Sequence, residues 1–596
     1  MCGIFGIILA DEQPLGDILT EAGRRLSYRG YDSVGCAAIH RDGAIDLRKD
    51  VGKVDEVAAR LNFTEMYGTR GILQLRWATF GAPSQANAQP HLDSLGKMVG
   101  AHNGNVVNNA ELRESFIKEG MLVRSANDGE SCVHAVERYL ARGMEPVQAI
   151  CHAHKDLAGD YAFVVGRVHE EKLYALKKGS GLVVGLLDNG ACLSSDLPSI
   201  LPLTRKILRV NDGEIVILSP GQVELYSVKD GLRIQRQPEI ITESMEAAQK
   251  GGYPHFMLKE IHEQPKVALD LLHLLEKSPD VQPMLEKIAA ARNLYLVGCG
   301  TSYHACLLAS VLFNSLAGRS AIPVLAPQFF AQYGASLSPR DVGIFVSQSG
   351  ETKDVINSVQ AAQPAGLTAF SLVNVIGSTL TRIVERCLPT AAGYEISVPA
   401  TKTFTNQVVA FLYLALRLGK KHTSLLEGLP RLMEETLEST APQVQTLIES
   451  LAPWNDLYCL GFGSTYAIAL EGALKLKEIT YAHCEGMLST EFKHGPLSAV
   501  SPDFPVLFVC SPEDVPIVVS GINEVSCRGG RTIAIAQADE RLRINASQVI
   551  TLPAADSILT PLLGVLPLQL LSYHLSLARG FNPDFPRNLS KTLTVD

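Results

Sequence analysis

The chain has 596 residues, too many for one ordinary hydrophobic core, and this length predicts roughly three to four domains. With 46% hydrophobic and 19% charged residues the composition is that of a globular protein, and a net charge of -9 without a basic tract argues against nucleic acid or an acidic membrane surface as the main partner. No apolar run reaches the length of a membrane span and no basic segment precedes the apolar amino terminus, so we expect a cytoplasmic protein.

Residues 1–238 form the first predicted domain. They are rich in glycine and contain short β-type runs, such as residues 35–39 and 161–165, separated by turn signals typical of layered sheets. Residues 239–285 are more polar, and we expect a linker there that is partly helical. The cysteines of the whole chain show no paired spacing, so we expect reduced thiols, no metal site and no cofactor.

The second half of the chain contains an internal repeat. Apolar strand-like runs alternate there with longer helical patterns, which predicts βαβ units and a parallel sheet. Residues 293–303 match residues 456–466, and a repeat this long indicates a duplicated domain. The predicted parts of this half are a first α/β domain (286–425), a helical connection (426–454), a second α/β domain (455–585) and a tail (586–596).

Cys2 is a candidate nucleophile because of its position. If Met1 is removed, which the small side chain of cysteine permits, the thiol lies beside its own α-amine. That amine has a reference pKa of about 7.7–8.0, which suits a general base at neutral pH. Taken alone, however, position 2 favours a chance cysteine.

Further motifs follow Cys2 in a definite order. They are residues 24–33, Arg76-Trp77-Ala78-Thr79, His102-Asn103-Gly104 and Asn127-Asp128-Gly129-Glu130. This ordered set resembles the class II glutamine amidotransferases, specifically the glutamine–fructose-6-phosphate aminotransferase family, and the resemblance runs the length of the chain. It implies an α/β multidomain protein, in which an N-terminal-nucleophile α-β-β-α glutaminase domain precedes two doubly wound α/β SIS domains.

The resemblance gives each of these motifs a role. Arg76 binds the α-carboxylate of glutamine, a contact that suits a guanidinium fork, and Asp128 meets the α-ammonium. The Asn103 side chain and the Gly104 N–H form the oxyanion hole. Trp77 lies on the route of ammonia. Without the resemblance, these residues would be read as a surface salt bridge, a turn and core packing.

Hydroxyl-rich turns in the first repeat predict an anion site. They are Thr301-Ser302 and Ser347-Gln348-Ser349-Gly350-Glu351-Thr352. Hydroxyls and backbone N–H groups at a strand-to-helix turn bind anions, whereas a Walker lysine and a dinucleotide glycine pattern are missing, so no nucleotide is implied. The longer motif resembles the phosphosugar loop of SIS domains. A Ser/Gly-rich loop without a ligand is the alternative.

Glu471, Lys475 and Glu478 fall on one face of a predicted helix in the second repeat. Such spacing usually marks a solvated ion-pair stripe, but the neighbouring residues are almost all Ala, Leu or Gly, which indicates a buried helix. A buried Glu-Lys-Glu row has to be paired and is a candidate for proton transfer.

The same resemblance assigns the sugar chemistry. It makes Glu478 the base that moves a proton between the first two sugar carbons, with Lys475 as a helper. His494 assists ring opening and comes from a neighbouring subunit, which implies a homodimer or a larger homo-oligomer. Lys591, in the tail, forms a Schiff base with the open-chain ketose and so activates its carbonyl.

Two segments depart from the family pattern. Gln74, Leu75 and Phe80 stand where the family commonly has two histidines and a threonine, which predicts a glutamine loop that closes with fewer hydrogen bonds. Pro399 and Ala400 replace an alanine and a serine beside the sugar. None of these positions holds a nucleophile, a base or an oxyanion donor, so we expect the chemistry to survive.

The favoured hypothesis is an enzyme whose partners are L-glutamine and fructose 6-phosphate and whose products are glucosamine 6-phosphate and glutamate. The alternatives are a paralogue that aminates or deaminates a different keto sugar phosphate, and a regulator that binds a sugar phosphate. Intact Cys2, Asn103 and Asp128 argue against a pure deaminase. The chain offers no basic helix-turn-helix candidate, which argues against a DNA-binding regulator.

Overall fold

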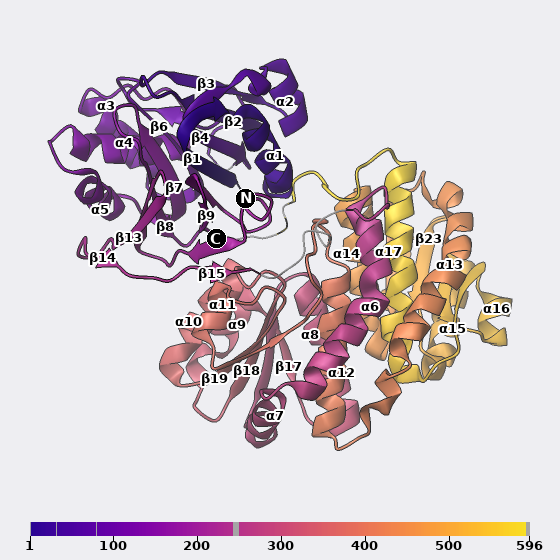
Figure 1. The fold of residues 1–596 in the computed structure, drawn as a ribbon. Helices are drawn as coiled ribbons and strands as arrows, with labels where there is room; N and C mark the ends of the chain where they lie inside the picture. Colours follow the sequence, from indigo (N-terminus) through magenta and orange to yellow (C-terminus); the bar gives the residue numbers. More distant parts are fainter. Residues whose placement is uncertain (1, 31, 79, 242–249, 590, 592–596) are drawn as a thin grey trace. The chain divides into compact units, whose positions relative to one another are not determined.

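The computed structural model describes residues 2–30, 32–78, 80–241, 250–589 and 591 (Figure 1). They form two compact units, which lie within Met1–Ala248 and Gln249–Lys591. Tyr31 and Thr79 of the glutamine motifs lie outside the described residues, as do 242–249 of the expected linker and 590 and 592–596 of the expected tail.

The first unit is built on two antiparallel sheets. In spatial order the first sheet is β15 (Glu239–Ile240), β11 (Lys206–Arg209), β9 (Val183–Leu187), β10 (Gly190–Ser194), β1 (Gly3–Pro14), β4 (Tyr67–Arg76), β2 (Ser33–Ile39) and β3 (Ile45–Val51). The second sheet is β14 (Arg233–Ile234), β13 (Gln222–Ser227), β12 (Glu214–Ser219), β8 (Leu173–Lys178), β7 (Gly159–Arg167), β6 (Met98–Val106) and β5 (His91–Leu92).

The two sheets of the first unit share one apolar core. Ile4 and Ile72 from the first sheet belong to the same buried cluster as Val99 and Val164 from the second. Helices cover the outer faces: α1 packs on β1 and β4, and α4 packs on β6 and β7. The bounds of these helices are α1 (Gly16–Leu26), α2 (Val54–Arg60), α3 (Asn109–Lys118), α4 (Asp128–Leu140) and α5 (Pro146–Asp156). The predicted α-β-β-α layering is therefore confirmed.

The second unit contains two parallel sheets of equal size. One is β17 (Ile322–Leu325), β16 (Leu294–Gly298), β18 (Val342–Ser347), β19 (Thr368–Val373) and β20 (Arg386–Pro389). The other is β22 (His483–Leu488), β21 (Asp456–Gly461), β23 (Pro505–Val509), β24 (Arg531–Gln537) and β25 (Gln548–Leu552). In both sheets the first strand of the repeat has its two successors in the chain on opposite sides, so the predicted duplication of an α/β domain is confirmed.

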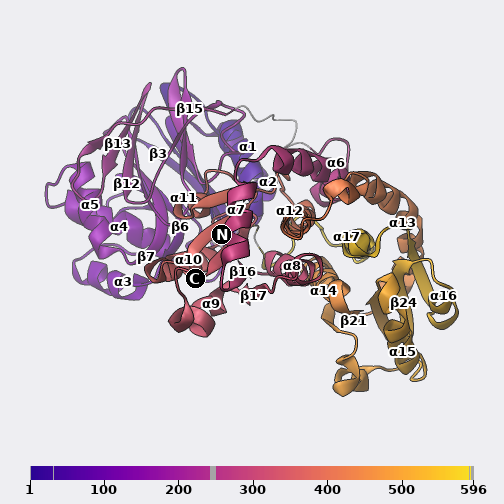
Figure 2. The ribbon, with the colours of Figure 1, turned by 90° about the horizontal axis from the view of Figure 1, so that it is seen from below.

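Helices of the second unit surround and join these sheets (Figure 2). Their bounds are α6 (Phe256–Lys277), α7 (Val281–Ala290), α8 (Thr301–Ala317), α9 (Ala326–Tyr333), α10 (Lys353–Ala362), α11 (Thr379–Ile383), α12 (Lys402–Leu418), α13 (Leu429–Leu451), α14 (Tyr466–Thr480), α15 (Val515–Ser526), α16 (Glu540–Asn545) and α17 (Thr560–Ala578). One large apolar cluster includes side chains from α6, α8, α12, α13, α14 and α17, which join the two α/β domains into one core.

Within the described ranges, the stretch Ser557–Ala578 is long and apolar enough to cross a membrane, but 89% of its apolar 18-residue window is buried, as in the core helix of a folded domain. Helix α6 occupies part of the segment expected to be a linker, and it packs against α12, α13 and α17. The Asp584 carboxylate accepts hydrogen bonds from the N–H groups of Phe256 (2.9 Å) and Met257 (2.8 Å), which satisfies two donors at the start of α6.

Candidate active sites

The first site centres on Cys2, which lies at the start of β1 beside the end of β4. The residue is buried, and the Trp77 N–H donates to its Sγ at 3.3 Å. Arg29 Nε donates to the Cys2 carbonyl at 3.1 Å and so holds the chain end in place. Burial raises the pKa of the Cys2 thiol, while the Trp77 N–H and the positive charge of Arg76 oppose that rise. Because a raised pKa keeps the thiol protonated, a nearby base is needed to activate it.

Arg76 ends β4 and is fully buried. Its Nη2 donates to the carbonyls of Phe80 and Gly81, the latter at 2.5 Å. Its Nε and Nη1 are buried without a hydrogen-bond partner. A buried guanidinium with unused donors is costly unless a ligand takes them, and a carboxylate has the matching geometry. The guanidinium is therefore well placed to hold a carboxylate while it also shapes the loop that follows β4.

Asn103 and Gly104 lie next to each other on β6. The Asn103 side chain is buried and both its Oδ1 and its Nδ2 are without a partner. Gly104 has φ +113°, and a Cβ at this position would lie 2.1 Å from the Asp160 carbonyl oxygen, so only glycine fits. An unsatisfied buried amide donor is what an oxyanion hole requires before its substrate arrives.

Asp128 begins α4 and is 1% exposed. Its Oδ2 accepts from the Val106 N–H at 3.0 Å and lies 3.6 Å from His102 Nε2. Burial lowers the pKa of His102, so this imidazole is neutral and adds no charge beside Asp128. The charges of both Asp128 and Arg76 act on Cys2, which brings an anion, a cation and the thiol into one site.

The motifs missed the amides that support this site. Gln74 and Gln89 both donate to the His102 carbonyl, at 3.2 and 3.1 Å, and Gln89 accepts from the His102 N–H at 2.7 Å. Gln74 is one of the departures from the family, and the structure gives it this supporting contact. Leu75 is buried in β4, and Phe80 meets Arg76 through its backbone.

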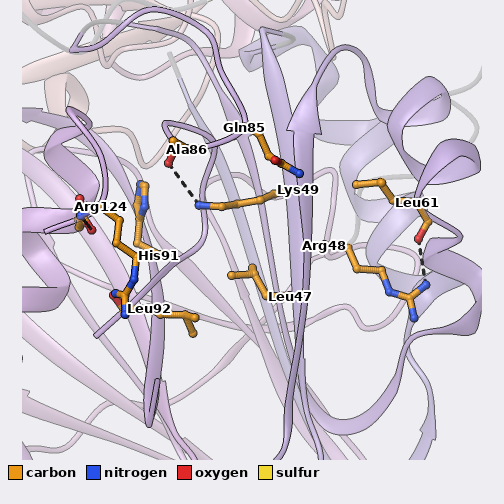
Figure 3. Close-up of a pocket in the computed structure, with 10 residues that line it drawn as sticks. Leu47, Arg48, Lys49, Leu61, Gln85, Ala86, His91, Leu92 and Arg124 are labelled. Carbon is orange, nitrogen blue, oxygen red and sulfur yellow. Dashed lines mark hydrogen bonds between the residues drawn. The ribbon is translucent and has the colours of Figure 1, made fainter. Parts of the chain in front are cut away.

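A cavity of about 500 Å³ is lined by residues of β3, of the loop that precedes β5 and of β5 itself (Figure 3). The side chains of Lys49, His91 and Arg124 line it together with Gln85 and Ala86. Lys49 Nζ donates to the Ala88 carbonyl at 2.6 Å, and burial lowers the pKa of Lys49 to about 8. None of the predicted glutamine residues is among the described residues that line this cavity.

The predicted anion loops lie at the carboxyl ends of β16 and β18, which are neighbours in the parallel sheet. Ser347 Oγ accepts from the Gly350 N–H at 3.0 Å and lies 2.8 Å from Thr352 Oγ1. Ser349 Oγ accepts from the Glu351 N–H at 3.1 Å. The chain turns sharply here, with φ +67° at Gly350. This crevice, where the strand order reverses, is the usual ligand position in an open α/β sheet.

The other predicted anion ligands divide between two places. Ser302 is buried near the start of α8, where its Oγ accepts from Gln407 Nε2 at 3.0 Å. Thr301 Oγ1 instead donates to Glu471 Oε1 at 3.1 Å and accepts from Lys475 Nζ at 3.2 Å. The structure thus brings Thr301 to the charged row of α14. Gln348 lies in the loop after β18, and its carbonyl accepts from the Asn374 N–H at 3.2 Å.

Helix α14 presents the predicted row of charges, in which Glu471 and Lys475 are buried and Glu478 is half-buried. Lys475 Nζ lies 3.4 Å from Glu471 Oε1 and 2.6 Å from Glu478 Oε2. Burial lowers the pKa of Lys475, but the two carboxylates outweigh it and raise that pKa above its usual value. Burial also raises the pKa of Glu478, although Lys475 opposes this. The solvated-stripe alternative is therefore wrong, because the row is enclosed and paired.

Lys591 reaches the same site from the end of the chain. Its Nζ donates to Glu395 Oε2 at 2.5 Å and to the Ser397 carbonyl at 2.7 Å. Its charge also opposes the burial that raises the pKa of Glu478, so the two groups share one electrostatic environment. His494 is exposed in a short 3-10 turn, and within the part of the chain that the structure describes its imidazole makes no hydrogen bond to Glu478 or Lys591.

The segment with Pro399 and Ala400 is held by its flanking residues. Glu395 accepts from the N–H groups of Thr401 (2.9 Å) and Thr403 (3.1 Å), and from Thr403 Oγ1 at 2.7 Å. The missing N–H of Pro399 is therefore not part of this pattern. Sequence reasoning did not single out Glu395, because no motif signal marks a lone glutamate that acts through backbone contacts.

Comparison with known proteins matches both units. Residues 75–201 match the family model of the glutamine amidotransferase domain, and residues 287–417 and 450–579 match that of the SIS domain. The chain is 40% identical, over the full length of both proteins, to the glutamine–fructose-6-phosphate aminotransferase (isomerizing) of Methanothermobacter thermautotrophicus. It is 39% identical to the protein of the same name from Aquifex aeolicus, again with 100% of both chains covered.

A solved structure agrees with the second unit. The C-terminal domain of glucosamine-fructose-6-phosphate aminotransferase from Francisella tularensis is 30% identical, with a TM-score of 0.52. The match covers 56% of this chain and 99% of that one.

Proposed function

The chain belongs to the glutamine–fructose-6-phosphate aminotransferase (isomerizing) family, and from this premise we propose how its residues divide the reaction. The enzyme hydrolyses glutamine and transfers the ammonia to fructose 6-phosphate, giving glucosamine 6-phosphate and glutamate. The observation that carries the residue assignment is a set of buried donors without partners, on Arg76 and Asn103, together with the charges of Arg76 and Asp128, which both act on Cys2.

In the first unit, Arg76 and Asp128 hold the carboxylate and ammonium of glutamine, and Cys2 attacks its side-chain amide. The α-amine of Cys2, free after removal of Met1, accepts the thiol proton. The Asn103 amide and the Gly104 N–H stabilise the oxyanion that forms. The amide nitrogen takes a proton and leaves as ammonia, and water then releases glutamate from the thioester.

Ammonia passes Trp77 on its way to the second unit. The phosphate of the sugar lies at the turns after β16 and β18, held by a set of polar side chains that are Ser302, Ser347, Gln348, Ser349 and Thr352. Helix starts and hydroxyls at these turns favour a dianion. Thr301 has a different role from these phosphate ligands. Its hydroxyl forms hydrogen bonds with Glu471 and Lys475, and it so connects the phosphate-binding turn to the acid–base residues of α14.

The covalent chemistry lies between Lys591 and Glu478. The neutral amine of Lys591 attacks the C2 carbonyl of the open ketose, and water leaves as the imine forms. Ammonia displaces the lysine at C2. Glu478 then takes a proton from C1 and delivers one to C2, which converts the ketose imine to the amino aldose. Lys475, held 2.6 Å from Glu478, tunes the proton affinity of that carboxylate.

We propose that His494 serves the site of a second copy, since its imidazole is exposed within its own chain. The partner subunit's His494 would then open the sugar ring, and the active protein would be a homodimer or a larger homo-oligomer. We also propose a cytoplasmic location, in keeping with the burial of the one membrane-length helix found in the described ranges.

Product analysis tests the function directly. The purified chain is incubated with glutamine and fructose 6-phosphate, and the products are identified by mass spectrometry and against authentic standards. We expect glucosamine 6-phosphate and glutamate. In a competition with tagatose 6-phosphate and sorbose phosphates, a higher kcat/KM for either competitor would overturn the assignment and favour a paralogue that aminates another keto sugar phosphate.

A further inference from the structure

Helix α6 places a fully buried glutamate against the segment that precedes α12. Glu260 is 2% exposed, and its Oε1 accepts from the N–H groups of Ile396 (2.5 Å) and Ser397 (3.2 Å). Its other oxygen, Oε2, is buried without a partner. A carboxylate with one oxygen left unpaired in the core is costly, so its protonation state requires an explanation.

Charged groups reach Glu260 from each neighbouring element that carries them. Glu395 comes from the segment before α12, Lys402 from α12 and Lys591 from the tail. On α6 itself, Lys259 and Glu263 lie one turn away from each other, at 3.5 Å, and Glu263 also pairs with Lys402 at 2.7 Å. His255 and Asp584 lie at the start of the helix, where Asp584 accepts from two backbone N–H groups.

The two lysines near Glu260 form ion pairs with other carboxylates. Lys591 pairs with Glu395, and Lys402 pairs with Glu263. Burial raises the pKa of Glu260 to about 8, the charge of Glu395 adds to the rise, and Lys591 and Lys402 oppose it. At neutral pH the side chain is therefore a neutral carboxyl group, which also explains how its Oε2 tolerates the core.

The neutral state of Glu260 affects the reactivity of the Lys591 amine. Lys591 has to lose a proton before its nitrogen can attack a carbonyl carbon, and the Glu395 carboxylate, 2.5 Å from its Nζ, already places one negative charge against it. A second negative charge on Glu260 would stabilise the ammonium form and delay the attack. The same Glu260 carboxyl fixes the Ser397 backbone, whose carbonyl orients the lysine at 2.7 Å.

We propose that Glu260 is a positioning residue for Lys591: as a neutral carboxyl it holds the Ile396–Ser397 backbone and leaves Glu395 as the single carboxylate that pairs with the lysine. The inference rests on the proposed role of Lys591 as the imine-forming residue. It adds to that role the condition under which the lysine becomes a nucleophile.

The test is the pH dependence of imine formation in the full-length protein. Wild type, Glu260→Gln and Glu263→Gln are mixed with fructose 6-phosphate and treated with borohydride, which reduces the imine to a stable amine on the lysine. Peptide mass spectrometry then locates and quantifies the adduct between pH 6 and pH 10. For wild type, we expect the plot of adduct formation against pH to show an inflection near pH 8, where Glu260 ionises.

Glu260→Gln should lose this inflection, because the amide resembles the neutral carboxyl and does not titrate. Its rate at pH 7 should stay within about fivefold of wild type, since at most one hydrogen bond is altered. Glu263→Gln, one turn away on the same helix, should keep an inflection but move it to lower pH, because Lys402 loses its partner and its charge then acts more strongly on Glu260. A wild-type inflection that persists unchanged in Glu260→Gln would overturn the inference.

Two further readouts separate the possible failures. If borohydride labels no lysine, or labels one other than Lys591, the proposed role of Lys591 fails and the inference falls with it. If Lys591 is labelled but the inflection ignores Glu260, only the inference fails. Infrared difference spectra of wild type minus Glu260→Gln should show the stretch of one protonated carboxyl at pH 7, and its absence counts against the neutral state even where Glu260→Gln is inactive.

Discussion

Replacement of Arg76 by lysine should disable glutamine use while the charge is kept. The guanidinium nitrogens Nε and Nη1 are available to bind a carboxylate, whereas Nη2 already donates to the Phe80 and Gly81 carbonyls. A lysine is a point charge that cannot form the paired bonds. Loss of one charge-assisted bond costs about 1.5–3 kcal/mol and loss of one loop bond about 1 kcal/mol, so kcat/KM for glutamine should fall about 10²–10³-fold.

The assay is glutamate release, measured in parallel with synthesis from ammonium salts, which should change little. Arg70→Lys is the matched control, because Arg70 is equally buried on the same strand but donates to backbone carbonyls, including that of Arg167 at 2.5 Å. The control should lower the Tm and leave kcat/KM for glutamine near the wild-type value. A drop of less than about fivefold in Arg76→Lys would refute the carboxylate contact.

Four further predictions follow from the same geometry. Cys2→Ala should abolish glutamine hydrolysis and keep synthesis at high ammonium concentration; persistent hydrolysis would mean that Cys2 is not the nucleophile. Lys49→Met removes the donor to the Ala88 carbonyl and should raise KM for glutamine about two- to tenfold, which steady-state kinetics will show. A fragment of residues 239–596 should fold and interconvert hexose 6-phosphates without glutamine, and a folded but inactive fragment would contradict this. In the fold the pKa of Glu260 is about 8 against 4.5 for an ordinary carboxyl, so its stabilising contribution is full below pH 4.5 and is lost as the pH rises through 8; the Tm of Glu260→Gln minus that of wild type should therefore grow between pH 5 and pH 8.

Local sequence patterns predicted the α/β fold of the second half and the candidate motifs. The alternation of buried runs with helical patterns predicted the α/β half, and the match between residues 293–303 and 456–466 predicted its duplication, which the two equivalent sheets confirm. Glu471 and Lys475 were identified because a helix brings residues four apart onto one face. Apolar neighbours indicated burial, and both residues are fully buried.

Contacts between distant segments could not be predicted in this way. Thr301 was grouped with the phosphate ligands because it follows a glycine turn, yet its hydroxyl lies 3.1 Å from Glu471, far along the chain. The replacement at Gln74 predicted a loss of hydrogen bonds relative to the family, but the Gln74 amide donates to the His102 carbonyl. Neither contact has a sequence period or a motif that would indicate it.

By itself the sequence determined which candidate groups the chain carries, since a thiol, a guanidinium and a hydroxyl-rich turn are properties of single residues and short spacings. Their roles came from the resemblance of the ordered set to a known family. The tertiary structure alone decided the proton states and the partners of those groups. Glu260 lies in a segment that reads as a polar linker, and only the packing of α6 against α12 removes it from water and sets it near Glu395 and Lys591. Desolvation and Coulomb interaction depend on distance in space, and no local pattern encodes that distance.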